Sequence, residues 1–181
     1  MLHCVKLGLW KYVARIVILM FTPVQRAVLD NMAEKVIKGQ CQTESRYFPR
    51  WNFSHGITSL TMLTADEWGG VVMTLVLLLH TTQGREAFRR SHPRTNNDMK
   101  LDGVLEVLEQ LLCFHAWLCY GPFWKCDDKA KEEEARRAIA IMLSCVKKHV
   151  PRTEGNKWRL TKFHELLHIP RDISRLGCPI R

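Results

Sequence analysis

The sequence predicts an all-α fold, built as a single multi-helix domain over residues 1–181. Apolar residues recur at intervals of three and four in several segments, which is the period of an amphipathic helix, whereas alternating strand patterns are weak. The length of 181 residues is that of about one domain and permits a packed core. We expect antiparallel helices joined by short loops.

A pair of helices is expected over residues 1–38. The first has one apolar face, Pro23 interrupts it, and Gly39 is expected to end the second. Lys11 and Arg15 lie inside the apolar run and no small-residue cleavage site follows it, so we interpret the run as a core helix and not a secretory signal. The apolar positions are Leu2, Val5, Leu9, Tyr12, Val13, Ile16, Val17 and Met20 in the first helix, and Val24, Ala27, Val28, Met32 and Val36 in the second.

An aromatic and polar connector is expected over residues 39–63. It contains "RYFPRWNF" at 46–53, in which exposed aromatic rings would stack on bases while arginines meet phosphates. The alternative, which we favour, is a loop whose aromatic residues pack on the helices.

The main helical bundle is expected over residues 64–150. Thr64 and Glu67 have the spacing of a capping box, which starts a largely buried helix that runs to about His80. Its apolar stretch at 71–79 is too short to cross a bilayer. Residues 91–98, which include Pro93, are expected to form a loop.

Two amphipathic helices are expected to complete this bundle. The first has apolar positions at Leu101, Val104, Leu105, Leu108, Leu111, Leu112, His115 and Leu118, and "GPFW" at 121–124 ends it. We interpret His115 as a hydrogen-bonded core histidine. Asp127 or Asp128 is expected to cap the second, with "KAKEEEARR" as its solvated face. Its expected buried stripe is Ala135, Ala138, Ile139, Met142, Cys145, Val146 and His149.

A basic C-terminal segment is expected over residues 151–181. Pro151 and Gly155 break the chain before a short helix that holds Phe163, Leu166 and Leu167, and Pro170 is expected to end or kink this helix.

The charge distribution favours a polyanionic partner. The chain carries 27 Lys and Arg against 18 Asp and Glu, a net charge of +9. Residues 147–181 contain nine basic and three acidic residues, so the net charge of this segment is +6. DNA is the expected partner, and no membrane partner is expected. The alternative is that these residues only keep the surface soluble. The candidate DNA-binding residues are Lys147, Lys148, Arg152, Lys157, Arg159, Lys162, Arg171 and Arg175.

The cysteine pattern indicates reduced thiols in an intracellular protein. Seven cysteines are scattered along the chain without a CxxC pair, and Cys113, Cys119 and Cys126 lack zinc-knuckle spacing.

An HExxH string lies at His164, Glu165 and His168. On a helix the two imidazoles would share a face and bind one zinc ion, with the carboxylate as general base. This zinc-hydrolase alternative needs a third ligand, but residues 169–181 offer only Asp172, beyond Pro170. A structural role for the histidines is therefore favoured, and no resident cofactor is expected.

Two segments in order resemble the catalytic region of cut-and-paste transposases of the CACTA and Plavaka kind. "MLHCVKLGLWKYV" is similar to their D-x-L-H…G-x-x-K segment, and "LTKFHELLHIPRDISRLGCPIR" is similar to their K-x-H-x-x-x-H…I-x-x-x-G-P segment. Cys178 separates the Gly-Pro pair, a departure from the pattern. The matching residues are Leu2, His3, Gly8, Lys11, Lys162, His164, His168, Ile173, Gly177 and Pro179.

The resemblance implies an RNase H-like core in which three acidic residues hold divalent metal ions. This chain would be the helical insert and flanks of that core. One family acid precedes the Leu-His pair and another follows the Gly-Pro segment, and neither lies within residues 1–181. The expectation is therefore a catalytically inactive, transposon-derived fragment in the nucleus, with divalent metal bound only in a full-length relative. A helical protein-interaction module, based on the Leu and Met stripes, is a further alternative.

Overall fold

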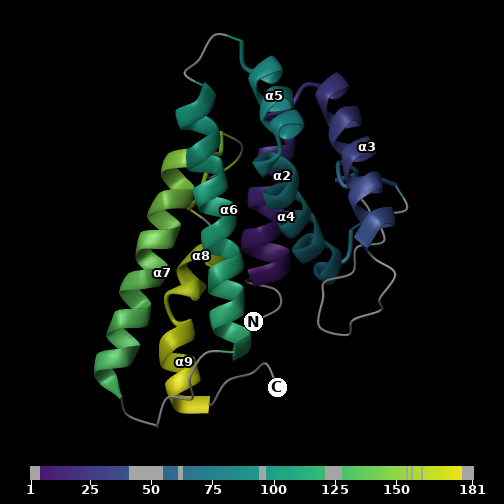
Figure 1. Cartoon of the computed structure of the whole chain (residues 1–181). Helices are drawn as coiled ribbons and strands as arrows, with labels where there is room; N and C mark the ends of the chain where they lie inside the picture. The colour runs from purple at the N-terminus through teal and green to yellow at the C-terminus, as the bar shows by residue number, and fades with distance from the viewer. Residues whose placement is uncertain are drawn as a thin grey trace.

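The computed structural model describes residues 5–40, 55–60, 63–93, 97–120, 128–153, 155, 157–159 and 161–176. All regular structure within these residues is helical, which confirms the predicted all-α class (Figure 1). The elements are η1 (Val5–Trp10, a π-helix), α2 (Lys11–Leu19), α3 (Pro23–Gln40), α4 (Ala65–His80), α5 (Thr82–Ser91), α6 (Asn97–Tyr120), α7 (Lys129–His149), α8 (Thr161–Leu166) and α9 (Ile169–Leu176).

Helix α4 is the centre of the core. It contacts η1, α2, α3, α5 and α6, and Trp68, Val72 and Leu75 on it are fully buried. The predicted capping box is confirmed at its start. Thr64 Oγ1 accepts a hydrogen bond from Glu67 N at 3.4 Å, and the Glu67 carboxylate accepts one from Thr64 N at 2.6 Å.

The N-terminal helix pair is present, with different boundaries. The π-helix η1 precedes α2, and α2 ends at Leu19, so Met20 lies in the following turn. Pro23 is the first residue of α3, where the missing N–H has no acceptor within the helix. Gly39 lies within α3, one residue before its end.

No single helix among the described residues is long and apolar enough to cross a membrane. Only together are the segments Gly8–Leu19 and Pro23–Val36 long and apolar enough for a membrane span, and the chain bends by 119° between them. Val13, Val17 and Ile18 of α2 are buried in the core.

Helix α5 was not predicted, and it shortens the expected 91–98 loop at one end. Its sequence is polar and buries only the narrow stripe of Gly84, Ala87 and Phe88. Thr81 ends α4 and starts α5, because its hydroxyl donates to Leu78 O at 2.6 Å and accepts from Gly84 N at 3.0 Å. A Cβ on residue 84 would overlap the carbonyl of Leu78, so this joint requires glycine.

Helices α6 and α7 form an antiparallel pair (Figure 1). The predicted apolar face of α6 is buried at its leucine and valine positions except Leu112, which is half-buried, as is His115. Asp128, one of the two predicted caps, caps α7 by accepting from Lys131 N at 3.2 Å. The predicted stripe of α7 was wrong at Ala138, which is exposed, and Leu143 is buried instead.

The C-terminal segment contains two short helices where one was predicted. Leu167 was predicted to lie in the short helix, but it lies in the turn between α8 and α9. Pro170 is the second residue of α9, a position in the first turn where its missing N–H costs no helical hydrogen bond. The proline therefore lies in the first turn of a new helix, α9, which packs on α7, while α8 packs on η1.

Candidate nucleic-acid interface

The basic residues predicted to bind DNA follow the chain from the last turn of α7 to α9. We call this set the C-terminal cations. Exposed members are Lys147, Lys148, Lys157, Arg159, Arg171 and Arg175, and half-buried members are Arg152 and Lys162. In the part of the chain that the structure describes, Arg171 is the member with an ion-pair partner, its neighbour Asp172, at 3.9 Å. Two of them, Lys147 and Lys148, also lie where a cation complements the helix dipole.

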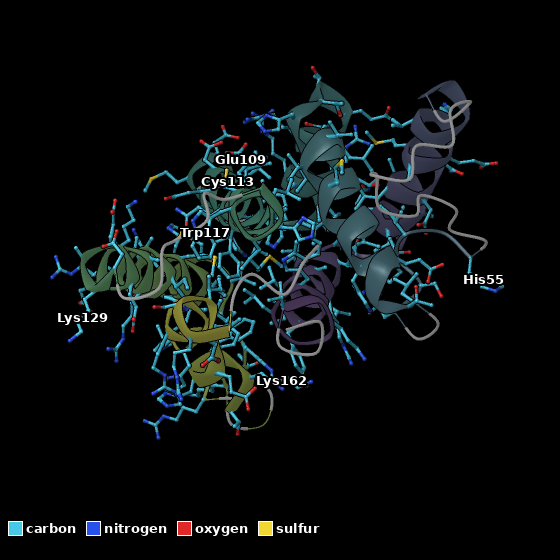
Figure 2. All side chains as sticks on the ribbon, turned by 90° about the horizontal axis from the view of Figure 1, so that it is seen from below. His55, Glu109, Cys113, Trp117, Lys129 and Lys162 are labelled. Atoms are coloured by element: carbon cyan, nitrogen blue, oxygen red, sulfur yellow. The ribbon has the colours of Figure 1, made fainter. Side chains whose placement is uncertain are left out.

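The C-terminal cations are distributed along the length of α7. A helix of 21 residues is about 30 Å long. Lys147 and Lys148 lie in its last turn, whereas α9 lies beside its N-terminal half (Figure 1). In the view from below, Lys162 lies on the opposite side of the molecule from Glu109 of α6 (Figure 2). The span is close to one turn of duplex DNA, about 34–36 Å.

Arg152 differs from the other C-terminal cations because its guanidinium has internal partners. It donates to Lys157 O at 2.6 Å and lies over the ring of Tyr12, 4.8 Å from the centroid. Arg152 therefore holds the connection between α7 and α8 against α2, and its guanidinium is less available to an external partner than the charged groups of the other C-terminal cations.

Trp158 anchors the same connection. Its indole Nε1 donates to Val150 O at 2.8 Å, and its ring stacks on Phe163 with centroids 4.7 Å apart. The indole is 6% exposed, although Lys157 and Arg159 on either side of it are exposed. One buried aromatic side chain thus fixes the backbone that presents two cations.

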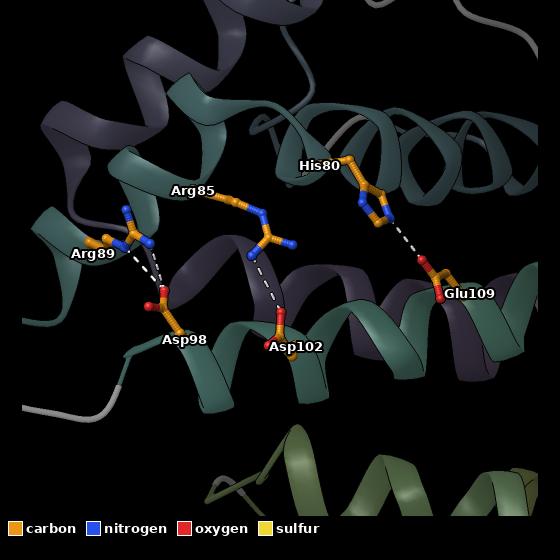
Figure 3. Close-up of polar contacts among 6 residues, drawn as sticks. All are labelled: His80, Arg85, Arg89, Asp98, Asp102 and Glu109. Atoms are coloured by element: carbon orange, nitrogen blue, oxygen red, sulfur yellow. Dashed lines mark hydrogen bonds and ion pairs between the residues drawn. The ribbon is translucent and has the colours of Figure 1, made fainter.

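Two arginines of α5, Arg85 and Arg89, contrast with the C-terminal cations, because carboxylates of α6 neutralise them (Figure 3). Arg89 donates through Nε and Nη2 to Asp98 at 3.0 and 2.9 Å, and Arg85 donates to Asp102 at 3.4 Å. His80 of α4 continues the row with a 2.7 Å contact to Glu109. We call these three cross-helix pairs the inter-helix seam.

The HExxH histidines do lie together. His164 Nε2 and His168 Nε2 are 3.1 Å apart, although His168 lies just beyond the end of α8. No third His, Cys, Asp or Glu converges on this pair among the residues that can be described. The zinc-hydrolase alternative stays a prediction, since the pair alone supplies two of the three ligands that it needs.

Most transposase-motif residues lie within the described ranges. Gly8 is buried in η1 and Lys11 is half-buried at the start of α2, while α8, which carries Lys162 and His164, packs on η1. The described parts of the two resembling segments are therefore neighbours in space. His168 and Ile173 are half-buried. Leu2, His3, Gly177, Pro179 and the "RYFPRWNF" segment lie outside the described residues.

A second cluster, which was not predicted, joins α6 to α7. Ligand atoms of Glu106, Cys145 and His149 all lie within 4.8 Å of one another, and the His149 and Glu106 side chains approach to 4.0 Å. Burial raises the pKa of the Cys145 thiol, and the charge of Glu106 and a hydrogen bond to its carboxylate act in the same direction, while Lys148 opposes them. The signal in the sequence was the four-residue spacing of Cys145 and His149 on the predicted inner stripe, but the partner on α6 required the packed pair.

An apolar groove lies between the C-terminal half of α6 and the N-terminal half of α7. Its volume is about 600 Å³, and Phe114, Trp117, Ile139 and Met142 contribute to its walls. Trp117 lies between the two helices in the view along them (Figure 2). Ile141 at its edge is 66% exposed.

The comparisons with known proteins give no relative. The sequence matches no protein-family model, and neither a curated protein nor a solved structure is significantly similar to it. The resemblance to cut-and-paste transposases therefore rests on the two terminal segments alone.

Proposed function

We propose that this chain is a helical DNA-binding module, derived from a transposase-like protein, which contacts the phosphates of duplex DNA through the C-terminal cations and carries out no chemistry. The observation that carries the proposal is the contrast in charge pairing. Lys147, Lys148 and Arg175 are exposed and have no ion-pair partner within the described residues, whereas Arg85 and Arg89 are paired with α6 carboxylates.

Phosphate binding follows from this distribution of charge. A cation without an ion-pair partner in the protein loses only its contacts with water when it binds a phosphate. Each phosphate that the protein neutralises releases counterions from the DNA. The span along α7 allows contacts on the backbone across about one turn of the duplex. Such contacts position the DNA and carry no sequence information, so we expect binding of low sequence specificity.

The absence of chemistry is part of the proposal. The described residues contain one convergent set of three metal-ligating side chains, the Glu106 cluster, and it shares no residue with the HExxH string or with the transposase motifs. The HExxH histidines have no third ligand among the described residues. These observations favour a binding module over a hydrolase.

The test is a salt series with a fluorescent 20-base-pair duplex. We expect the logarithm of the affinity to fall linearly with the logarithm of the salt concentration. A variant with Lys147→Gln, Lys148→Gln, Arg171→Gln and Arg175→Gln should flatten this slope by about 0.9 for each phosphate that the protein no longer neutralises, up to about 3.6 for four.

The matched control is Arg136→Gln, together with Lys129→Gln, in the N-terminal half of α7. Both residues are exposed, so the changes remove charge from the same helix without touching the C-terminal cations. We expect a smaller change in slope than for Lys147→Gln with Lys148→Gln. Equal changes in the two pairs, or binding that salt does not weaken, would contradict the proposal.

A protein-interaction module is a second candidate, and the apolar groove between α6 and α7 favours it. Self-association through the groove would increase with concentration in sedimentation velocity, and Ile141→Lys, at its exposed edge, would abolish it. A monomer at every concentration would remove self-association as the role of this groove.

A further inference from the structure

The cluster of Glu106, Cys145 and His149 brings three different ligand types to one point between two helices. Cys145 and His149 are one turn apart on α7, so their side chains share a face, and Glu106 faces them from α6. Cys145 and His149 are half-buried, while Glu106 is exposed. The cluster is therefore open to solvent on the Glu106 side.

The backbone of α6 accommodates the imidazole of His149 closely. A Cβ on Gly103 would overlap Nδ1 and the adjoining ring carbons of His149, so only glycine leaves room for the ring at this position. Gly103 is itself buried within α6, where glycine destabilises a helix by about 1 kcal/mol relative to alanine. The position of the His149 ring therefore explains why a glycine lies at position 103 in spite of this cost.

The chemistry of the ligand atoms selects a class of metal. A thiolate and an imidazole are ligands of borderline-soft divalent ions, and a carboxylate completes three of the four positions of a tetrahedral zinc site. Such a site holds its ligand atoms about 3.3–3.8 Å apart. The atoms here lie within 4.8 Å of one another, so small side-chain rotations, chiefly of exposed Glu106, would close the set.

We infer that Glu106, Cys145 and His149 bind a divalent transition metal ion, zinc by the chemistry of the ligands, which joins α6 to the C-terminal end of α7. The fourth position faces solvent. Binding replaces the proton of the Cys145 thiol with the metal, and this proton passes to solvent. The inference does not depend on DNA binding.

The experiment uses cobalt as the probe of the full chain after treatment with a chelator. A thiolate bound to cobalt gives a charge-transfer absorption in the near ultraviolet, and zinc should displace the cobalt and remove it. Cys145→Ser should lose this band, and His149→Gln and Glu106→Gln should each weaken cobalt binding on the order of a hundredfold or more, since even residues behind the ligands contribute about 10–100-fold.

Gly103→Ala gives a sharper version of the same test. It keeps all three ligand residues but displaces the ring of His149, and it should therefore also weaken cobalt binding. As a second readout, zinc at about 100 times its Kd should raise the Tm of the wild type by roughly 5–10 °C. The same zinc should leave the Tm of Cys145→Ser unchanged, and this comparison holds even where a variant is less stable.

Three controls separate the site from other ligands. Cys113→Ser removes an exposed thiol from α6, His80→Gln removes a histidine that contacts a glutamate across the seam, and the double variant His164→Gln with His168→Gln removes the HExxH pair. None should change the cobalt band or its affinity. A folded wild type without the band, a band that persists in Cys145→Ser, or cobalt affinity unchanged in Glu106→Gln would overturn the site.

Discussion

The inter-helix seam and the C-terminal cations use the same residue types in opposite ways. In the seam, Arg85 and Arg89 donate to carboxylates of α6, and the positive charge is neutralised where two helices meet. Among the C-terminal cations, Lys147, Lys148 and Arg175 are exposed and have no ion-pair partner within the described residues. The positive charge of the chain, +9 in total, is therefore not spread evenly over the surface, because it is neutralised in the seam and not among these C-terminal cations.

This contrast separates stability from binding. Exposed ion pairs contribute little, with a median of about 0–1 kcal/mol, so the seam orients α5 on α6 more than it stabilises the fold. Cations without ion-pair partners also contribute little to folding beyond the helix-dipole interaction of Lys147 and Lys148, and their interaction energy is available to a polyanion. Substitutions in the two regions should therefore change different measurements.

The largest effect is expected in the core beneath the seam. Phe88→Ala removes a fully buried ring that packs edge-on against Phe21 at 5.5 Å and stacks on His92 at 4.4 Å. We expect the free energy of unfolding to fall by about 3–5 kcal/mol in urea denaturation. DNA affinity of the folded fraction should not change, and a parallel decrease in affinity would show that the two regions are coupled.

The next effect is expected at the anchor of the C-terminal cations. Trp158→Phe removes the donor to Val150 O and leaves a buried acceptor unpaired, at a cost of about 1–3 kcal/mol. Trp68→Phe is the matched control, because the indole N–H of Trp68 is buried without an acceptor among the described residues. The first substitution should be the more destabilising, and should weaken DNA binding through Lys157 and Arg159. The reverse order in thermal denaturation would argue against this role of the Val150 bond.

A smaller effect is expected at the start of α4. Thr64→Ala removes one half of the capping box and should lower stability by about 1 kcal/mol, without changing DNA affinity. Thr82→Ala serves as a control, since Thr82 is exposed in the first turn of α5 and Thr81 is the residue that caps it. Stability curves that coincide for these two variants would rule out the cap as a stabilising feature.

The smallest effect on stability is expected in the seam itself. A double-mutant cycle with Arg89→Gln and Asp98→Asn should give a coupling energy of about 0.2–1 kcal/mol that decreases as salt is added. Arg175→Gln among the C-terminal cations should change stability by less than about 0.5 kcal/mol. A large decrease in stability in Arg175→Gln would show that this cation is structural.

The elements with strong local signals could be predicted from the sequence. The capping box at Thr64 and Glu67, the apolar face of α6 and the cap at Asp128 depend on neighbouring residues, and all three are present. Helix α5 was missed because only Gly84, Ala87 and Phe88 of its ten residues are buried, which leaves little periodicity to detect. Pro170 was expected to end or kink the helix before it; a new helix, α9, contains Pro170 in its first turn, where proline is well tolerated.

The candidate sites depended more on tertiary packing. The sequence identified the C-terminal cations by composition, but not that Arg152 would contact Tyr12 and the Lys157 carbonyl. It also placed Cys145 and His149 on one stripe without indicating Glu106 as their partner, because the register of α6 against α7 is a property of the packed pair. The sequence shows the charges and their spacing. It does not show which charged side chains lack an ion-pair partner in the folded chain.

The most direct test of the account compares two charge-matched variants in one salt series. Arg85→Gln with Arg89→Gln removes two charges from the seam, and Arg171→Gln with Arg175→Gln removes two from α9. We predict that the α9 pair flattens the slope of log affinity against log salt by about 1.8 and that the seam pair leaves it unchanged. Equal slopes for the two variants would contradict the claim that the C-terminal cations bind DNA and that the arginines of the seam do not.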